Sequence, residues 1–265
     1  MINSILIIWH RDLLRFWRNK TRVIGSFMFP ILWLAVFGIG ISATVSLPAP
    51  GIRFLDFLFP GILAQFLIFT AMFGAISILQ DREFGFLKEV LDSPAPRIAV
   101  AIGKILGGAT SAFISIIPVI ILGRVVGVHV TVKMILLMLP ALAMLAIALS
   151  GLGVAIVSRL KSLDSGQYVF QFIMFPLTML SGAFFPLSNL PTWLSILTKI
   201  NPISYAVDMV RRIVLMNLPG VPDQAVTMLS PTINGSVPAL STEIIIVAIF
   251  MALVTSFAAW GFNRS

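Results

Sequence analysis

Histidines and acidic residues are the first side chains to test for catalysis, because they move protons and bind metals near neutral pH. The 265-residue chain holds 2 histidines, 10 Asp and Glu residues and no cysteine. Three apolar segments of membrane-spanning length lie between His10 and His129, which puts the two rings on opposite faces of a membrane. Neither histidine then shares a face with a second metal ligand or with a serine placed to act as a nucleophile. The sequence predicts no catalytic, cofactor-binding or metal-binding residue in this chain.

Nucleotide binding is not expected either. Gly103-Lys104-Ile105 is the candidate for a phosphate-binding loop, but such a loop needs Ser or Thr after the lysine. It also needs a glycine five residues before Gly103, where Ile98 stands. The strings LSGLG (149–153) and LSGAF (180–184) resemble an ATP-cassette signature only faintly and lie within apolar segments. Energy for any transport must therefore come from outside this chain.

Ion-driven transport is also disfavoured, because ion-coupled transporters usually hold an ionisable group at membrane depth and cation channels often ring their pores with acids. The ten carboxylates are expected in loops or at the ends of apolar segments. They are Asp12, Asp56, Asp81, Glu83, Glu89, Asp92, Asp164, Asp208, Asp223 and Glu243.

A charged segment, DREFGFLKEVLDSPAPR (residues 81–97), stands between two long apolar segments. If residues 86–93 form a helix, its apolar face carries Phe86, Leu87, Val90 and Leu91, with Lys88, Glu89 and Asp92 opposite. Pro94 and Pro96 end that helix after about two turns. So short a helix is unstable alone in water. Its apolar face must be buried either in the lipid interface or in a partner protein.

Composition identifies the class of protein that positions this segment. Hydrophobic residues make up 58% of the chain, charged residues 11%, and the mean hydropathy is +1.04. A soluble domain carries roughly 25% charged residues. The net charge of +8 is expected to mark the cytoplasmic side of a membrane protein rather than a nucleic-acid-binding surface. The prediction is an all-α membrane protein with one domain, residues 1–265.

Six membrane spans are expected, at about residues 23–45, 57–79, 101–123, 134–158, 168–187 and 244–262. Gly103, Gly107, Ser111 and Ser115 recur every four residues in the third span. Such spacing lets helices approach closely, and we interpret it as packing within the chain rather than as a dimer seam. The fifth span contains Pro176 and is followed by a glycine- and proline-rich stretch, which favours a segment that re-enters the membrane.

The segments outside the spans have their own patterns. Residues 1–22 place Arg11, Arg15, Arg18 and Arg22 on one helical face, opposite an apolar face with two tryptophans. This is typical of an amphipathic helix lying in the membrane interface against anionic headgroups. Residues 188–242 form a long outer loop, in which residues 201–212 (NPISYAVDMVRR) favour a short amphipathic helix.

Lysines and arginines indicate the orientation, because they are enriched on the cytoplasmic side. Twelve of the 18 lie in residues 1–22, 81–104, 159–167 and 263–265, and six lie in the other loops. Both termini and residues 81–97 are therefore expected in the cytoplasm, in a multi-pass protein of the cell membrane.

Taken together, these features resemble the permease subunits of type-two ATP-binding-cassette exporters over nearly the whole chain. One anchor is the pattern acid-x-Gly-x-Leu-x-x-Leu-x-x-Ser-Pro, which here reads Glu83, Gly85, Leu87, Val90 in place of the second leucine, Ser93 and Pro94. Two others are LSGAFFPLSNLP, starting at Leu180, and the stretch from Asn201-Pro202 to Arg211.

The resemblance implies that residues 81–97 carry a coupling helix that sits in a groove of a separate cytoplasmic ATPase subunit, which binds ATP and magnesium. Two permeases with two ATPases would form the exporter, as a homodimer or with a related permease, in a bacterial inner membrane. Residues 188–242 would form short helices that re-enter the outer leaflet. The residues implied in coupling are Glu83, Gly85, Phe86, Leu87, Lys88, Val90, Leu91 and Pro94.

Substrates of that family include drugs, lipids, lipid-linked glycans and polysaccharides. Phe66, Phe69 and Phe73 recur at helical spacing in the second span and could line a hydrophobic path, although packing against lipid is the more common role of such residues. Spans without charge favour a hydrophobic or amphiphilic substrate, such as a drug or a lipid-like molecule. The alternative is a polytopic membrane protein not driven by ATP, such as a small channel or an assembly factor, whose charged segment would bind lipid.

Overall fold

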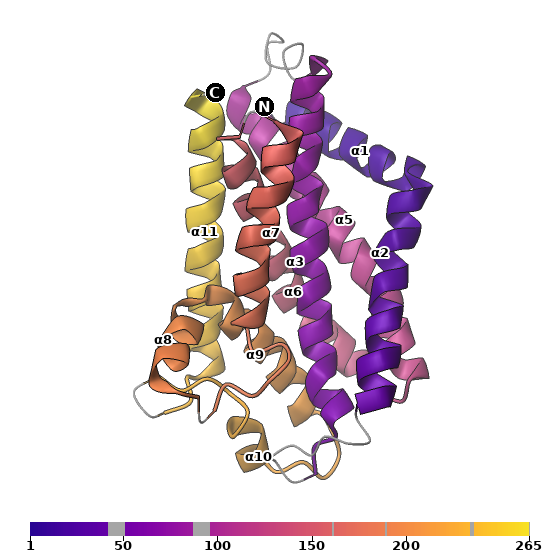
Figure 1. Ribbon diagram of the computed structural model, residues 1–265, viewed down its shortest axis with the longest axis vertical. Helices are drawn as coiled ribbons and strands as arrows, with labels where there is room; N and C mark the ends of the chain where they lie inside the picture. The colour runs from indigo at the N-terminus through magenta and orange to yellow at the C-terminus, as the bar shows by residue number, and fades with distance from the viewer. Residues whose placement is uncertain (42–50, 87–95, 161, 189, 234–235, 265) are drawn as a thin grey trace.

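The computed structural model describes residues 1–41, 51–86, 96–160, 162–188, 190–233 and 236–264. Within these ranges the chain is helical, and its β-structure is limited to one isolated bridge between Ile233 and Ser236. Figure 1 shows a bundle of long helices with both ends of the chain at the same end of the bundle. Helix α1 (Ile2–Arg18) crosses that end, which we call the α1 end.

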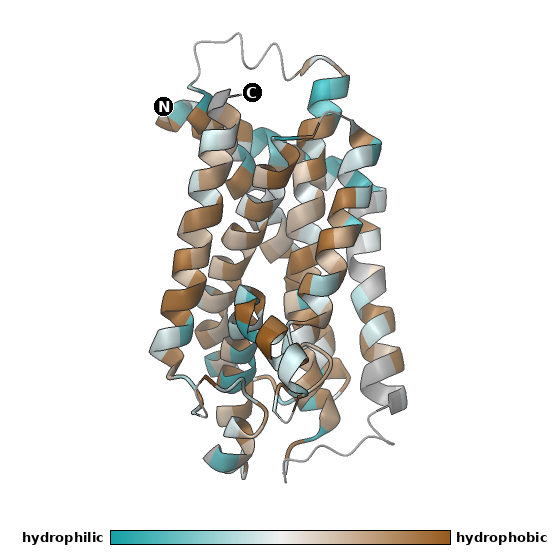
Figure 2. Cartoon of the chain, turned by 60° about the vertical axis from the view of Figure 1, so that its left-hand side comes forward, coloured by the Kyte–Doolittle hydropathy of each residue, from teal (hydrophilic) through white to brown (hydrophobic). Residues whose placement is uncertain are grey.

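In the described part of the chain, four helices are long and apolar enough to cross a membrane. They are α3 (Phe54–Glu83), α5 (Arg97–Val125), α6 (Val132–Val157) and α11 (Leu240–Arg264). Each exceeds the ~20 residues that span a hydrocarbon core of ~30 Å. Figure 2 shows hydrophobic residues along the middle of these helices and hydrophilic residues gathered towards the ends. The chain is therefore a multi-pass membrane protein.

The predicted first and fifth spans correspond to shorter helices. Helix α2 (Lys20–Trp33) continues as a π-helix, η1 (Leu34–Ile41), and α7 (Leu163–Met179) has 17 residues. Gly182, with φ of 72°, lies in the turn that follows α7, a conformation that suits glycine. The count of six spans and the re-entrant segment remain predictions.

Helix α3 forms the centre of the bundle. It packs against α5, α6, α7 and α9, and 78% of its most apolar stretch of 18 residues is buried inside the chain. Helix α11 lies at the periphery, with 22% of its most apolar stretch of 18 residues buried. A helix packed on several neighbours cannot shift without moving them, because protein interiors are close-packed. Movement at either end of α3 would therefore reach most of the bundle.

Helix α1 packs on α5 through the small residues noted above. A Cβ atom on Gly103 would lie 2.8 Å from the Ile8 Cβ, and one on Gly107 would lie 2.9 Å from the Asp12 Cβ. The Trp9 indole Nε1 also donates a hydrogen bond of 3.1 Å to the Thr110 hydroxyl. Packing within the chain is thus confirmed at these two glycines.

Three short helices lie at the opposite end: α8 (Thr192–Ile200), α9 (Pro202–Met216) and α10 (Asp223–Thr227). The helix predicted over 201–212 is confirmed as part of α9. Asn201 caps it, because its side-chain oxygen accepts from the Ile203 amide at 3.1 Å, and Pro202 occupies the first turn. Instead of lying on the surface, α9 packs against α3, α6 and α11.

The α1–α5 contact predicts that Gly107→Val displaces α1, because the added side chain would overlap Asp12. Overpacking of this kind lowers the free energy of unfolding by about 1–3 kcal/mol. In the cysteine-free chain, a cysteine at buried Ile8 reports on the contact, and its maleimide labelling should rise in the Gly107→Val background. Gly25→Ala is the control, since a Cβ there meets nothing within 4 Å. Equal labelling in both backgrounds would contradict this account of α1.

Candidate functional site

Asp81, near the end of α3, gathers three cations from two other helices. Its carboxylate oxygens lie 2.7 Å from Arg11 Nη2, 2.7 Å from Arg15 Nη1 and 2.7 Å from Lys104 Nζ. Lys104 also lies 3.1 Å from Asp12 Oδ1. We call Arg11, Asp12, Arg15, Asp81 and Lys104 the Asp81 cluster. It ties α1 and α5 to the last turn of α3.

Burial makes this cluster important for stability. The side chain of Asp81 is 8% exposed and that of Lys104 is 3% exposed. An ion removed from water needs a partner of opposite charge, and removal of one partner leaves an uncompensated charge. Lys104 can remain charged inside α5 because Asp81 and Asp12 face it. The Asp81 cluster therefore fixes the position of α1 more strongly than apolar contact alone would.

The contacts of Arg11 and Arg15 correct one expectation. Their helical face was expected to meet anionic headgroups, but both guanidinium groups face the carboxylate of Asp81. The helical wheel identifies a cationic face and does not identify the anion that it meets. The position of α1 at the membrane interface remains a prediction.

The cluster lies at the start of the predicted coupling segment. Glu83 Oε1 accepts a hydrogen bond of 2.9 Å from the amide of Leu163, the first residue of α7. Gly85 has φ of 77°, which only glycine adopts without strain, so it turns the chain out of α3. The guanidinium of Arg11 lies 4.5 Å from the centre of the Phe86 ring, a cation–π contact.

These contacts give three of the eight predicted coupling residues a structural context. Arg82, which is not one of the eight, adds a further contact, because its guanidinium donates a hydrogen bond to the Leu160 carbonyl in the turn between α6 and α7. The start of the segment is thus linked to α1, to α5 and to the α6–α7 turn. Leu87, Lys88, Val90, Leu91 and Pro94 lie outside the described residues.

The phenylalanines proposed for a substrate path lie in different environments. Phe66 is buried in the core of the chain, whereas Phe69 and Phe73 are half-buried. The Phe69 and Phe73 rings stack at 6.3 Å, and Phe73 meets Phe170 of α7 edge-to-face at 6.3 Å. Phe73 therefore lies where α3 meets α7, and Phe69 stacks on it.

A second set of charges lies at the opposite end, and we call Asp208, Arg211, Arg212 and Glu243 the α9 cluster. Arg212 Nε lies 2.9 Å from Asp208 Oδ2, and Arg212 Nη2 lies 3.5 Å from Glu243 Oε1. Arg212 also donates to the Pro238 carbonyl at 2.9 Å and to the Ser230 hydroxyl at 3.2 Å. It therefore joins α9 to α11 and to the chain between α10 and α11.

Arg211 joins α9 to α3. Its guanidinium lies 4.0 Å from the centre of the Phe57 ring and donates to the Gly182 carbonyl. It is 1% exposed, and Asp208 is 0% exposed. Asp208 lies in the helix predicted over residues 201–212, but its burial was not predicted; Arg212 balances its charge there. The spacing of Asp208 and Arg212, four residues apart on one helix, was the signal available for this pair.

No group of three or more His, Cys, Asp or Glu side chains that could hold a metal ion occurs in the described part of the chain. The two charge clusters instead pair cations with anions that come from different helices. Such an arrangement fixes helices relative to one another. The candidate site is therefore a mechanical junction at the α1 end, where a charged segment meets three helices.

The Asp81 cluster predicts that Asp81→Asn loosens α1 and lowers stability, because Lys104 loses its nearest carboxylate. Breaking a buried pair costs about 3–5 kcal/mol, and the half-exposed arginines reduce this to roughly 1–3 kcal/mol. The measurements are the unfolding temperature in detergent and maleimide labelling of a cysteine at Ile8. Asp164→Asn is the control, an exposed acid of α7 that removes the same charge outside the cluster. Equal effects of the two variants would contradict a specific role for Asp81.

Comparison with known proteins identifies the family. The transport permease ycf38 of Cyanophora paradoxa is 25% identical over 79% of this chain and 73% of its own length. Nodulation protein J of Rhizobium leguminosarum bv. viciae is 23% identical over 78% of this chain and 80% of its own. The multidrug ABC transporter permease YbhR of Escherichia coli (strain K12) is 27% identical over 63% of this chain and 45% of its own. The family described as ABC-2 type transporter matches residues 3–215, and the chain belongs to that family of transporter permeases.

Proposed function

We propose that this permease is the membrane-spanning subunit of an ATP-driven exporter and that it moves a hydrophobic or amphiphilic molecule out of the cytoplasm or the inner leaflet. A separate ATPase subunit binds ATP and magnesium. The observation that carries the proposal is the junction of Asp81, Arg11, Arg15 and Lys104 at the base of the charged segment. The protein lies in the inner membrane of a bacterium, and both termini and this junction face the cytoplasm.

The junction supports coupling because it converts a local push into movement of several helices. An ATPase that binds residues 86–91 acts on a segment that begins three residues after Glu83. Glu83 is bonded to α7, Arg82 to the α6–α7 turn, and Asp81 to α1 and α5. Packed helices respond to such a force by shifting between discrete arrangements.

An apolar or amphiphilic substrate is supported by the exposed aromatic surface of α7. Phe73, with Phe69 stacked on it, contacts Phe170 on the buried face of α7. Tyr168, Phe172 and Phe175 lie on the opposite face of α7 and are 74%, 82% and 68% exposed. Aromatic rings bind apolar and amphipathic molecules through large contact areas. Drug and lipid-like molecules fit this surface better than long polar glycans do.

The same exposed face of α7 supports a second permease copy. Residues 168, 172 and 175 recur at helical spacing and form one stripe. Two such stripes facing each other would enclose a path between two chains, and one chain alone provides only one wall. The partner is a second copy of this chain or a related permease.

Coupling is tested by changing the apolar face of the segment. Burial of one leucine contributes about 1.5–3 kcal/mol. If both leucines contact the ATPase, Leu87→Asp with Leu91→Asp should weaken docking by about 3–6 kcal/mol, or ~10²- to 10⁴-fold. Pull-down of the co-expressed ATPase and substrate-stimulated ATP hydrolysis measure the effect, after insertion at the wild-type level is verified.

Lys88→Ala is the control for the double variant, because loss of a solvated charge should change docking by about 0–1 kcal/mol. Full ATPase association in the double aspartate variant would refute the coupling proposal. It would instead favour a segment that binds lipid, as in a membrane protein not driven by ATP.

The dimer is tested by cysteine cross-linking in the cysteine-free chain. Phe172→Cys should form a cross-linked dimer in membranes under mild oxidation or with a short bismaleimide, because the exposed faces of α7 meet. Ile249→Cys is the control, an exposed residue of peripheral α11. Cross-linking at Ile249 but not at Phe172 would show that the copies meet through another face.

A further inference from the structure

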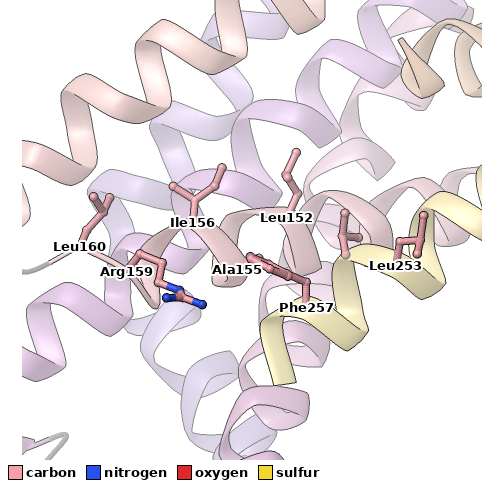
Figure 3. Close-up of a pocket in the computed structure, with 8 residues that line it drawn as sticks. Leu152, Ala155, Ile156, Arg159, Leu160, Leu253 and Phe257 are labelled. Atoms are coloured by element: carbon pink, nitrogen blue, oxygen red, sulfur yellow. The ribbon is translucent and has the colours of Figure 1, made fainter. Parts of the chain in front are cut away.

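A groove between α6 and α11 lies outside the coupling junction and the aromatic surface. Its volume is 540 Å³, within the range of about 300–1,000 Å³ that is usual for small-molecule sites. Figure 3 shows Leu152 and Ile156 along α6, with Leu253 and Phe257 from α11. All lining side chains are apolar except Arg159, which lies two residues after the end of α6.

Arg159 places a positive charge at one end of this groove. Its guanidinium lies 4.8 Å from the centre of the Trp260 ring and 5.8 Å from that of Phe257. The residue is exposed, and among the described residues no carboxylate forms an ion pair with it. A guanidinium held by aromatic faces keeps its hydrogen-bond donors available for an anion.

The groove also lies on α11, the least buried of the four membrane-spanning helices in the described residues. Leu253 is 64% exposed and Phe257 is 50% exposed on the peripheral helix α11. Trp260 lies at the α1 end of that helix, and tryptophan is enriched where the hydrocarbon of a membrane meets the headgroups. A cation beside a tryptophan at this depth is placed at the level of lipid phosphates.

We propose that this groove binds an anionic phospholipid of the leaflet at the α1 end, with an acyl chain between α6 and α11 and the phosphate on Arg159. The pattern of the site matches that of the ligand: apolar walls, a cation at one end and an aromatic ring beside it. The site is distinct from the transport path, because the path is assigned to α3 and α7. The lipid fills the space between α6 and α11 and holds the two helices together.

The test measures lipid retained by the purified protein. Native mass spectrometry during titration with phosphatidylglycerol or phosphatidylcholine, in detergent, should show preferential binding of phosphatidylglycerol. Arg159→Gln should weaken that binding roughly tenfold, the loss expected for one charge-assisted hydrogen bond, and Arg159→Lys should retain part of it. Leu253→Trp should reduce binding of both lipids, because the larger side chain occupies the groove.

Arg18→Gln is the matched control, since it removes an exposed positive charge at the same end of the bundle without touching the groove. Binding in this variant should equal that of the wild type. Equal losses in Arg18→Gln and Arg159→Gln would assign the preference to general surface charge and overturn the proposal. Equal binding of the two lipids by the wild type, or undiminished binding in Leu253→Trp, would overturn it as well.

Discussion

The pairing of Asp81 with Lys104 is the constraint on which the α1 end of the bundle depends. Both side chains lie in apolar helices, where an unpaired charge would be costly. Lys104 and Asp81 pair with each other, and each also has partners on α1. Asp12 pairs with Lys104, and Arg11 and Arg15 pair with Asp81. The need to satisfy buried charge thus makes α1 part of the transport domain rather than an attachment to it.

The same rule governs the opposite end, where Arg211 and Arg212 meet Asp208 and Glu243. Helix α3 is held at both ends: Arg211 contacts Phe57 near its start, and the Asp81 cluster holds its last turn. The helix between these points packs through apolar side chains and close contacts, such as Gly153 of α6 against Met72 and Ala75. Charge therefore positions the two ends of α3, and close apolar packing positions the part between them.

The long helices could be predicted because ~20 consecutive apolar residues have few alternatives to a membrane span. Helix α9 was predictable from the amphipathic pattern of residues 201–212, and close packing within the chain from the spacing of Gly103 and Gly107, although the spacing did not identify α1 as the partner. The pairing of Asp81 with Arg11, 70 residues away, could not be predicted. Hydropathy locates charges along the chain, but contacts between distant charges are decided by how the helices pack.

Residues 83–94 include positions explained by contacts within this subunit and positions left for a partner protein. Glu83 bonds to α7 and Gly85 turns the chain, so these two positions are explained by the fold of this subunit. Phe86 lies at the boundary, because Arg11 contacts its ring while 38% of the residue is exposed. A partner that covers Phe86 would alter the surroundings of Arg11 and hence of Asp81. Docking at the segment would then be linked to the position of α1 through Arg11.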